Sequence, residues 1–383
     1  MRREFSQHCR EHCRERYPGV RWPRAARWAA VLMAFAVHDV TAQSVERARL
    51  EPMPQAAAAA ATTRTERDLD GPLRIGLLLP MGDPLLARAA RAVREGVRSG
   101  VRARSERIEL VECIYGGEAR VEGAYQLCVE QNVAWVIGPL GRNDVAALVA
   151  ARPRQARPTL LLSPLATIPP TGFVTLAPDL ESEAEAIARR VQQDGCRSPL
   201  LLEAGGAIAA RVAVTVNVWW QGSSALPLRS SSVPARRDLQ RVVEQWRLQG
   251  VDCLIFAGSH QVLSELRPYL RGMAIYVTTA TYDAELDRIV DWTGIRIADA
   301  PLVIDTRSGE WDAFVPPAGT APPVMRLHAL GVDAARLVLA ADGMVLPQSF
   351  QGAIGHLDLR DRQYRRTPAL GEFRERTLVP LAP

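Results

Sequence analysis

Histidine and serine carry most acid–base and nucleophilic chemistry in proteins, and here their spacing builds no catalytic centre. Ser259 and His260 are adjacent, but no evident acid orients the imidazole, and a serine there is more typical of a helix cap. The chain has no Gly-x-Ser-x-Gly elbow, and no lysine follows the glycines of residues 138–141 as in a phosphate-binding loop. The histidines are mostly far apart: His8, His12, His38, His260, His328 and His356. We therefore predict no catalytic residue and no cofactor.

Four cysteines lie beyond the first apolar segment: Cys113, Cys128, Cys196 and Cys253. None belongs to a Cys-x-x-Cys pair, so their spacing predicts no metal site. Four cysteines allow three disulfide connectivities, which require an oxidising compartment. Four buried free thiols are the alternative.

The charge distribution argues against nucleic acid as a partner. The 383 residues include 47 Arg, no Lys and 42 Asp+Glu, with 48% hydrophobic residues, which is ordinary for a globular protein of about two domains. Residues 1–42 hold eight Arg and four acids, which leaves 39 basic and 38 acidic residues in the remainder. A nucleic-acid-binding domain concentrates its positive charge on one face instead. We attribute the absence of Lys to genomic base composition.

A basic stretch followed by an apolar one predicts export. Arg21, Arg24 and Arg27 precede the apolar residues 28–37, and small residues lead up to Ala42. This order is typical of a secretory signal peptide, so we expect cleavage after Ala42 and a periplasmic protein. The apolar stretch is shorter than the roughly 20 residues that span a bilayer, although an N-terminal membrane anchor is an alternative.

Residues 43–72 are expected to be a flexible linker that follows the signal peptide of residues 1–42. The linker contains two prolines and a run of alanines, without the apolar periodicity that supports packing. Gln43 stands where a lipoprotein has its lipidated cysteine, so a lipid anchor to the outer membrane is not predicted.

From Leu73 onward, apolar runs alternate with segments of helical periodicity. The predicted strands are residues 73–79, 108–111, 134–137, 159–162, 173–176, 200–202, 253–257 and 275–278. Helices are predicted for residues 85–99, 122–130, 144–151, 182–193, 207–219, 236–248 and 261–270. Strands that alternate with helices form parallel sheets through crossover connections. We therefore predict an α/β fold with two doubly wound parallel-sheet lobes.

Three motifs carry a resemblance to a known superfamily. They are Arg74-Ile-Gly-Leu-Leu-Leu-Pro80, Trp135-Val-Ile-Gly-Pro-Leu140, and Leu161-Leu-Ser-Pro-Leu-Ala-Thr167 followed by Phe173-Val-Thr-Leu-Ala-Pro178 and an acidic helix start. In this order and spacing, they resemble the type I periplasmic binding proteins, the superfamily of the branched-chain amino acid receptors. The resemblance implies two lobes joined by a three-strand hinge.

The C-terminal third resembles a narrower family. It contains Asp299-Ala-Pro-Leu302, Arg326-Leu-His-Ala-Leu-Gly-Val-Asp-Ala334, and Phe350 to Leu359 followed by Tyr364-Arg-Arg-Thr-Pro368. Gly352 and Gly355 among alternating apolar residues suit a bulged hairpin. These segments look like the LppC family of penicillin-binding protein activators. The resemblance implies a docking module that activates a peptidoglycan synthase, a class A penicillin-binding protein.

The resemblance also implies a ligand cleft. In the amino acid receptors, a Ser-Pro-x-Ala-Thr loop after the fourth strand binds the ligand, and Ser163, Ala166 and Thr167 match it. Such a loop at the carboxyl ends of strands suits a small anion. Alternatively, the prolines of this loop only shape a tight turn.

Two further positions complete the predicted cleft. Gly141-Arg142-Asn143 stands where the receptors carry serines, and Arg142 favours an anionic ligand or an empty, closed cleft. Asp283 is the nearest carboxylate that could bind an α-amino group. The alternative function is therefore a periplasmic solute receptor, for an amino acid or another small anion, that feeds an ABC permease.

Lobe boundaries follow from the same resemblance. Lobe 1 is expected to contain residues 73–177 and 305–348, and lobe 2 residues 178–304 and 349–383, with crossings near Ala177, residues 302–305 and residues 347–351. This assignment puts Cys113 with Cys128 and Cys196 with Cys253, because a bridge needs Cα atoms within about 7 Å.

Overall fold

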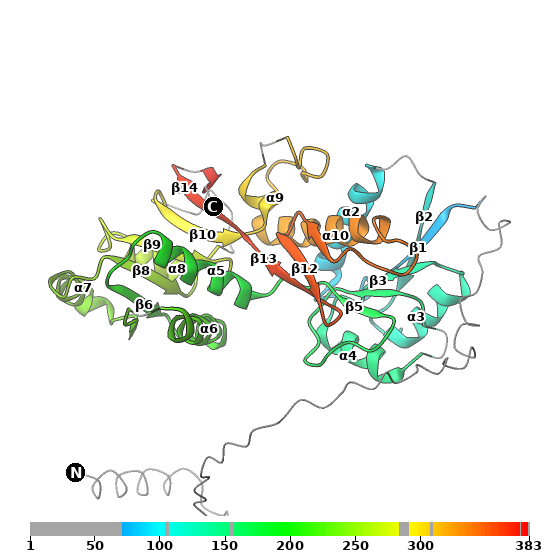
Figure 1. Ribbon diagram of the computed structural model, residues 1–383, viewed down its shortest axis with the longest axis horizontal. Coiled ribbons are helices and arrows are strands. Elements are labelled where there is room, and N and C mark those ends of the chain that lie inside the picture. The colour runs from blue at the N-terminus through cyan, green and yellow to red at the C-terminus, as the bar shows by residue number, and fades with distance from the viewer. Residues whose placement is uncertain are drawn as a thin grey trace, which may run out of the picture. The chain divides into compact units, whose positions relative to one another are not determined.

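The computed structural model describes residues 71–103, 107–153, 156–224, 226–282, 291–306, 309–375 and 377–381. The predicted signal peptide lies outside these ranges, as does the predicted linker apart from its last two residues. Within them the chain forms two sheets, each covered by helices on both faces (Figure 1). The predicted α/β fold with two doubly wound lobes is confirmed. No helix of the described ranges has the length and apolar character needed to cross a membrane.

The first sheet joins a parallel core to a C-terminal antiparallel segment. Its parallel strands are β1 (Leu73–Leu79), β2 (Ile108–Ile114), β3 (Trp135–Ile137), β4 (Thr159–Leu161) and β5 (Phe173–Thr175). The C-terminal strands are β11 (Ser349–Gln351), β12 (His356–Arg360) and β13 (Gln363–Thr367). In the described part of the chain the order is β11-β12-β13-β5-β4-β3-β1-β2. The predicted hairpin around Gly352 and Gly355 is the antiparallel pair β11–β12.

Two helices on one face of the first sheet approach each other through glycines. They are α2 (Ala87–Arg102) and α10 (Pro322–Leu339), while α3 (Val121–Glu130) and α4 (Arg142–Ala151) cover the opposite face (Figure 1). A Cβ on Gly96 would lie 2.0 Å from the carbonyl oxygen of His328, and one on Gly331 2.1 Å from that of Val93. Only glycine fits such a backbone contact, so these two positions fix how closely α2 and α10 pack.

The second sheet has the same layered construction. In the described residues its order is β15-β14-β10-β9-β8-β6-β7. The strands are β6 (Pro199–Glu203), β7 (Arg229–Ser232), β8 (Cys253–Ala257), β9 (Ala274–Thr278), β10 (Ile295–Asp299), β14 (Ala369–Arg374) and β15 (Thr377–Pro380). Helices α5 (Leu180–Gln193) and α6 (Ala207–Ser223) pack on one face, and α7 (Leu239–Leu248) and α8 (His260–Leu266) on the other. A short 3-10 helix, η3 (Arg236–Asp238), precedes α7.

The chain passes between the two sheets at three places. The first crossing follows β5, the second contains the short helix α9 (Pro301–Ile304), and the third is Pro368, between β13 and β14. Apolar side chains of the second crossing are shared between the lobes, because Leu302 packs in the core of the first and Val303 in that of the second.

The third crossing differs from the prediction. Residues 349–367 do not belong to the second lobe, because β13 pairs with β5 and β14 pairs with β10. Leu357 and Tyr364 are accordingly buried in the core of the first lobe. The crossing therefore lies at Pro368 and not near residues 347–351.

Each lobe contains a disulfide. Cys113 of β2 is joined to Cys128 of α3, with Cα atoms 5.8 Å apart. Cys196, just after α5, is joined to Cys253 at the start of β8, with Cα atoms 6.2 Å apart. These are the two pairings put forward from the sequence. The first bridge fastens α3 to β2, and the second fastens the connection between α5 and β6 to β8.

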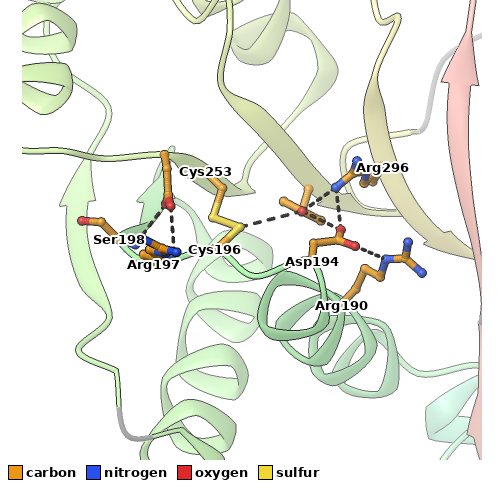
Figure 2. The surroundings of a disulfide bond; sticks show 9 residues. Arg190, Asp194, Cys196, Arg197, Ser198, Cys253 and Arg296 are labelled. Atoms are coloured by element: carbon orange, nitrogen blue, oxygen red, sulfur yellow. Dashed lines mark hydrogen bonds and ion pairs between the residues drawn. A yellow bond between two sulfur atoms is a disulfide. The ribbon is translucent and has the colours of Figure 1, made fainter.

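Figure 2 shows the surroundings of the second bridge. The carboxylate of Asp252, next to Cys253, is held there by backbone donors. Asp252 accepts hydrogen bonds from the backbone nitrogens of Arg197 and Ser198, at 2.8 Å and 3.0 Å. Atoms of Cys196, Asp252 and Cys253 that can bind a metal lie within 4.8 Å of one another. Because the disulfide uses both sulfur atoms, only the carboxylate remains as a metal ligand in the oxidised protein.

Peptide mapping tests both bridges. Trypsin digestion without reductant is expected to give residues 108–120 linked to 121–142, and residues 191–197 linked to 248–271, since Pro268 blocks cleavage after Arg267. Reduction should release all four peptides. Removal of either bridge by a Cys→Ser pair should lower the free energy of unfolding by about 2–4 kcal/mol. Alkylation of any of these four thiols in the non-reduced protein would contradict the assignment.

Candidate functional site

A cavity of about 270 Å³ lies where elements of the two lobes meet. Its lining is Arg142, Pro178, Asp179, Leu180, Glu183, Arg211, Thr279, Ala300, Arg326, Ile354 and Arg366. Helices begin at this cavity, because Arg142 is the first residue of α4 and Leu180 the first of α5. With four arginines and two acids in its lining, the cavity is a charged site.

Glu183 and Arg366 form an ion pair between the lobes. Glu183 lies in the first turns of α5 and Arg366 on β13, and their side chains are only 5% and 3% exposed. The second carboxylate oxygen of Glu183 accepts hydrogen bonds from the backbone nitrogen and hydroxyl of Thr279, at 2.9 Å and 2.6 Å. Burial raises the pKa of Glu183, and the charge of Arg366 opposes this shift.

Arg366 has further partners around the first crossing. Its Nη2 atom also donates to the carbonyl oxygen of Asp179 at 3.2 Å, and its Nε atom to the hydroxyl of Ser182 at 3.3 Å. Its Nη1 atom donates to the carbonyl oxygen of Ile354 at 3.4 Å. The guanidinium therefore binds the start of α5 and the β11–β12 connection at once.

Asp299 and Arg326 form a second buried pair. Asp299 ends β10 and is fully buried, while Arg326 lies in the second turn of α10. The Nε and Nη2 atoms of Arg326 donate to the two carboxylate oxygens at 2.8 Å and 2.7 Å, a bidentate geometry. The backbone nitrogen of Ala300 donates to the same carboxylate at 2.7 Å. The guanidinium also lies 5.3 Å from the ring centre of Tyr282.

A third pair is more exposed and lies within the second lobe. Arg211 of α6 donates from Nε and Nη2 to Glu181 of α5, at 3.0 Å and 2.7 Å, and both side chains are more than 40% exposed. Partial burial by itself raises the pKa of Glu181, but Arg211 and the nearby Arg142 hold it below its usual value. The carboxylate of Glu181 thus interacts electrostatically with both Arg211 and Arg142.

Three of the four cavity arginines therefore already have counter-ions within the protein. Arg211, Arg326 and Arg366 each bind a carboxylate of the protein, so an anionic ligand would have to compete with these contacts. The described lining includes no Cys, His, Ser or Lys, and the hydroxyl of Thr279 is engaged with Glu183. This chemistry suits binding and orientation more than proton transfer or nucleophilic attack.

Asp333 supports the wall of the cavity from beneath. This carboxylate of α10 is fully buried and accepts hydrogen bonds from the backbone nitrogens of Ala353 and Ile354, at 2.7 Å and 2.8 Å. A Cβ on Gly352 would lie 2.4 Å from its Oδ2 atom, so glycine is required there. Burial raises the pKa of Asp333 to about 6, against the two backbone donors and Arg336.

The predicted cleft residues separate in the structure. Arg142 lines the cavity, whereas its neighbour Asn143 is exposed and does not line it. Ser163 donates its hydroxyl to the carbonyl oxygen of Leu140.

Two more cleft residues lie on the exposed loop after β4, and one lies elsewhere. Ala166 and Thr167 are exposed, and the carbonyl oxygen of Thr167 accepts a hydrogen bond from Gln363 of β13 at 3.1 Å. Asp283 lies outside the described residues.

Sequence reasoning missed four charged residues that form the two buried pairs: Glu183, Asp299, Arg326 and Arg366. All four lie within the segments that indicated the family, but they were used there only to recognise the family and were not proposed as site residues. Their signal was available, because charged side chains among buried apolar residues need partners and are rarely buried without them.

A family model described as "LppC putative lipoprotein" matches residues 51–364. The chain belongs to the LppC family. Curated relatives share the name "Penicillin-binding protein activator LpoA". That of Haemophilus influenzae is 28% identical over 225 residues, which are 55% of this chain and 38% of the relative. That of Aliivibrio fischeri is 22% identical over 331 residues, 75% and 54% respectively. The chain thus spans about half or less of the length of these relatives.

Solved structures show the same fold. The C-domain of Haemophilus influenzae LpoA, titled as "a regulator of PBP1A", matches with a TM-score of 0.65 and 21% identity, over 81% of this chain and all of that domain. A protein from Chromobacterium violaceum, titled as a branched-chain amino acid ABC transporter, matches with a TM-score of 0.67 and 26% identity, over 79% and 100%. This LppC chain therefore has the type I periplasmic-binding-protein fold that was predicted.

A pH titration of stability tests Asp333. Between pH 3.8 and about 6 the folded protein holds a proton that the unfolded chain has released, so this residue adds stability as the pH falls. We expect the unfolding free energy of wild type minus that of Asp333→Asn to be greater at pH 5 than at pH 7.5, by about 1 kcal/mol. The matched control is the exposed Asp312→Asn, which should show no such change. An equal difference at the two pH values for Asp333→Asn would contradict the assignment.

Proposed function

We propose that this chain is a non-catalytic activator that docks onto a class A penicillin-binding protein. Membership of the LppC family supports this function, as do relatives named penicillin-binding protein activators. The match to the whole LpoA C-domain supports a docking role for the folded region, because that structure is titled a regulator of PBP1A.

The internal pairing of three cavity arginines carries the proposal. A receptor for an amino acid keeps unpaired polar groups ready for the ligand's charges. Here the buried arginines already bind Glu183 and Asp299, and the predicted receptor loop of Ser163 to Thr167 does not line the cavity. Because its buried arginines are already paired, the cleft is better suited to a structural role than to ligand binding. A protein partner would then bind to the outer surface.

The proposed location is the periplasm, with residues 1–42 acting as a signal peptide. The basic and apolar pattern of that segment supports export, and disulfides are stable in that oxidising compartment. Under the proposed function, the chain would meet the periplasmic region of the synthase there.

A solute receptor is the second candidate. It is favoured by the similarity to the Chromobacterium violaceum ABC transporter structure, at 26% identity over its whole length. Under this function, Arg142 and the loop of Thr167 would bind an amino acid or another small anion when the lobes close.

Two titrations separate these functions. The periplasmic region of the cognate class A synthase should bind the chain saturably, and its peptidoglycan synthesis should increase, because docking is the proposed activity. Calorimetry with the common amino acids should give no binding heat, because three of the four cavity arginines are already paired. Synthase binding should be unchanged in Thr167→Val and in Arg142→Gln, which alter only the proposed receptor groups.

The opposite pattern would overturn the proposal. Heat with an amino acid that disappears in Thr167→Val, together with no binding to the synthase, would establish the receptor instead. A heat-denatured sample of the same chain controls for non-specific binding to the synthase.

A further inference from the structure

Both buried ion pairs connect one lobe to the other. Glu183 on α5 belongs to the second lobe, and its partner Arg366 lies on β13 of the first sheet. Asp299 on β10 belongs to the second sheet, and its partner Arg326 lies on α10, which packs in the first core. The two pairs cross the hinge in the same sense, since the second lobe supplies both acids and the first both arginines.

The geometry leaves the pairs little freedom. The carboxylates of Glu183 and Asp299 are also held by backbone nitrogens of their own lobe, from Thr279 and Ala300. Separation of the lobes would therefore break both ion pairs, one of them bidentate, together with the hydrogen bonds of Arg366 to Ser182 and Asp179. Charge-assisted hydrogen bonds are stronger than neutral ones, so their simultaneous loss opposes the motion.

Apolar packing beside the pairs also opposes separation of the lobes. Met325, next to Arg326 on α10, packs against the core of the second lobe, while Leu327 packs against the core of the first. The start of α10 is thus wedged between the two cores. A hinge motion would have to open this apolar contact together with the Asp299–Arg326 pair.

We propose that Glu183–Arg366 and Asp299–Arg326 form a lock that holds the two lobes in one orientation without any ligand. Receptors of this architecture close about the hinge when a ligand bridges the lobes. Here carboxylates of the chain itself bridge them. The fold is consequently a rigid body whose outer surface is preformed, and this property does not depend on which partner docks.

Distance measurements between spin labels test the lock. One label is placed at Ala146→Cys on α4 and the other at Val218→Cys on α6; both sites are exposed, and Cys9→Ser and Cys13→Ser remove other thiols. The full chain should give one narrow distance distribution, which a mixture of amino acids does not shift. A second population without ligand, or a shift with the mixture, would overturn the lock, and this measurement needs no lock variant.

Variants locate the effect in the pairs. Glu183→Gln should broaden the distribution or add a second distance, because it removes the charge that holds Arg366. Its matched control is Glu181→Gln, two residues earlier on α5, whose partner Arg211 lies in the same lobe. That control should retain the narrow distribution.

A milder change covers the case of an unfolded Glu183→Gln. Thr279→Val removes only the hydroxyl donor to Glu183, so it should widen the distribution less than Glu183→Gln while the chain stays folded, as circular dichroism would report. If folded Glu183→Gln and Thr279→Val both match the Glu181→Gln control, the pairs do not hold the lobes and the proposal fails.

Discussion

A carboxylate can be buried only where a cation and hydrogen-bond donors meet it, and this requirement shapes the region between the lobes. Glu183 needs Arg366 on one side and Thr279 on the other. The carboxylate of Glu183 has these partners only if three elements come together: the start of α5, the end of β9 and strand β13. The sheet position of β13, beside β5, follows the same requirement, because Arg366 reaches the carboxylate from there.

Helix α10 links three parts of the molecule. Gly331 lets it pack against α2 in the first core, Arg326 near its start binds Asp299 of the second sheet, and Asp333 holds the backbone of residues 353–354. A change in the crossing of α2 and α10 would therefore move Asp333 and, with it, the part of the cavity wall at Ile354. The segment that indicated the LppC family from the sequence is the one that connects the core, the cleft and the β11–β12 hairpin.

Local patterns predicted most elements of the fold but not every pairing of strands. Apolar runs such as residues 73–79 and 253–257 are strands because both their faces are covered by helices. Strand β7 was missed because its sequence, Arg-Ser-Ser-Ser, is polar and lies at a sheet edge. The third crossing was misplaced because it was inferred from the resemblance alone, and no local pattern reveals that β13 joins the first sheet and β14 the second.

The candidate site was harder to predict for a related reason. Arg142 was found because it follows a recognisable strand end, and it does line the cavity. Glu183 and Arg366 are 183 positions apart, so no local spacing reveals that they pair. Asp299 and Arg326 are 27 positions apart on different kinds of element, with the second crossing between them. Long-range ion pairs of this kind depend on the tertiary fold, and single-sequence patterns report only short-range geometry.

Every cation in these ion pairs is a guanidinium, since all 47 basic residues are arginines. Guanidinium groups stay protonated at any pH that a protein experiences. They also do not react as primary amines do. Amine-reactive cross-linkers therefore find no side chain to modify on this chain. Carbodiimide coupling, in contrast, joins exposed carboxylates such as Glu185 to lysines of a docked protein. Each such side-chain link has a defined direction, because only the other protein can supply the lysine.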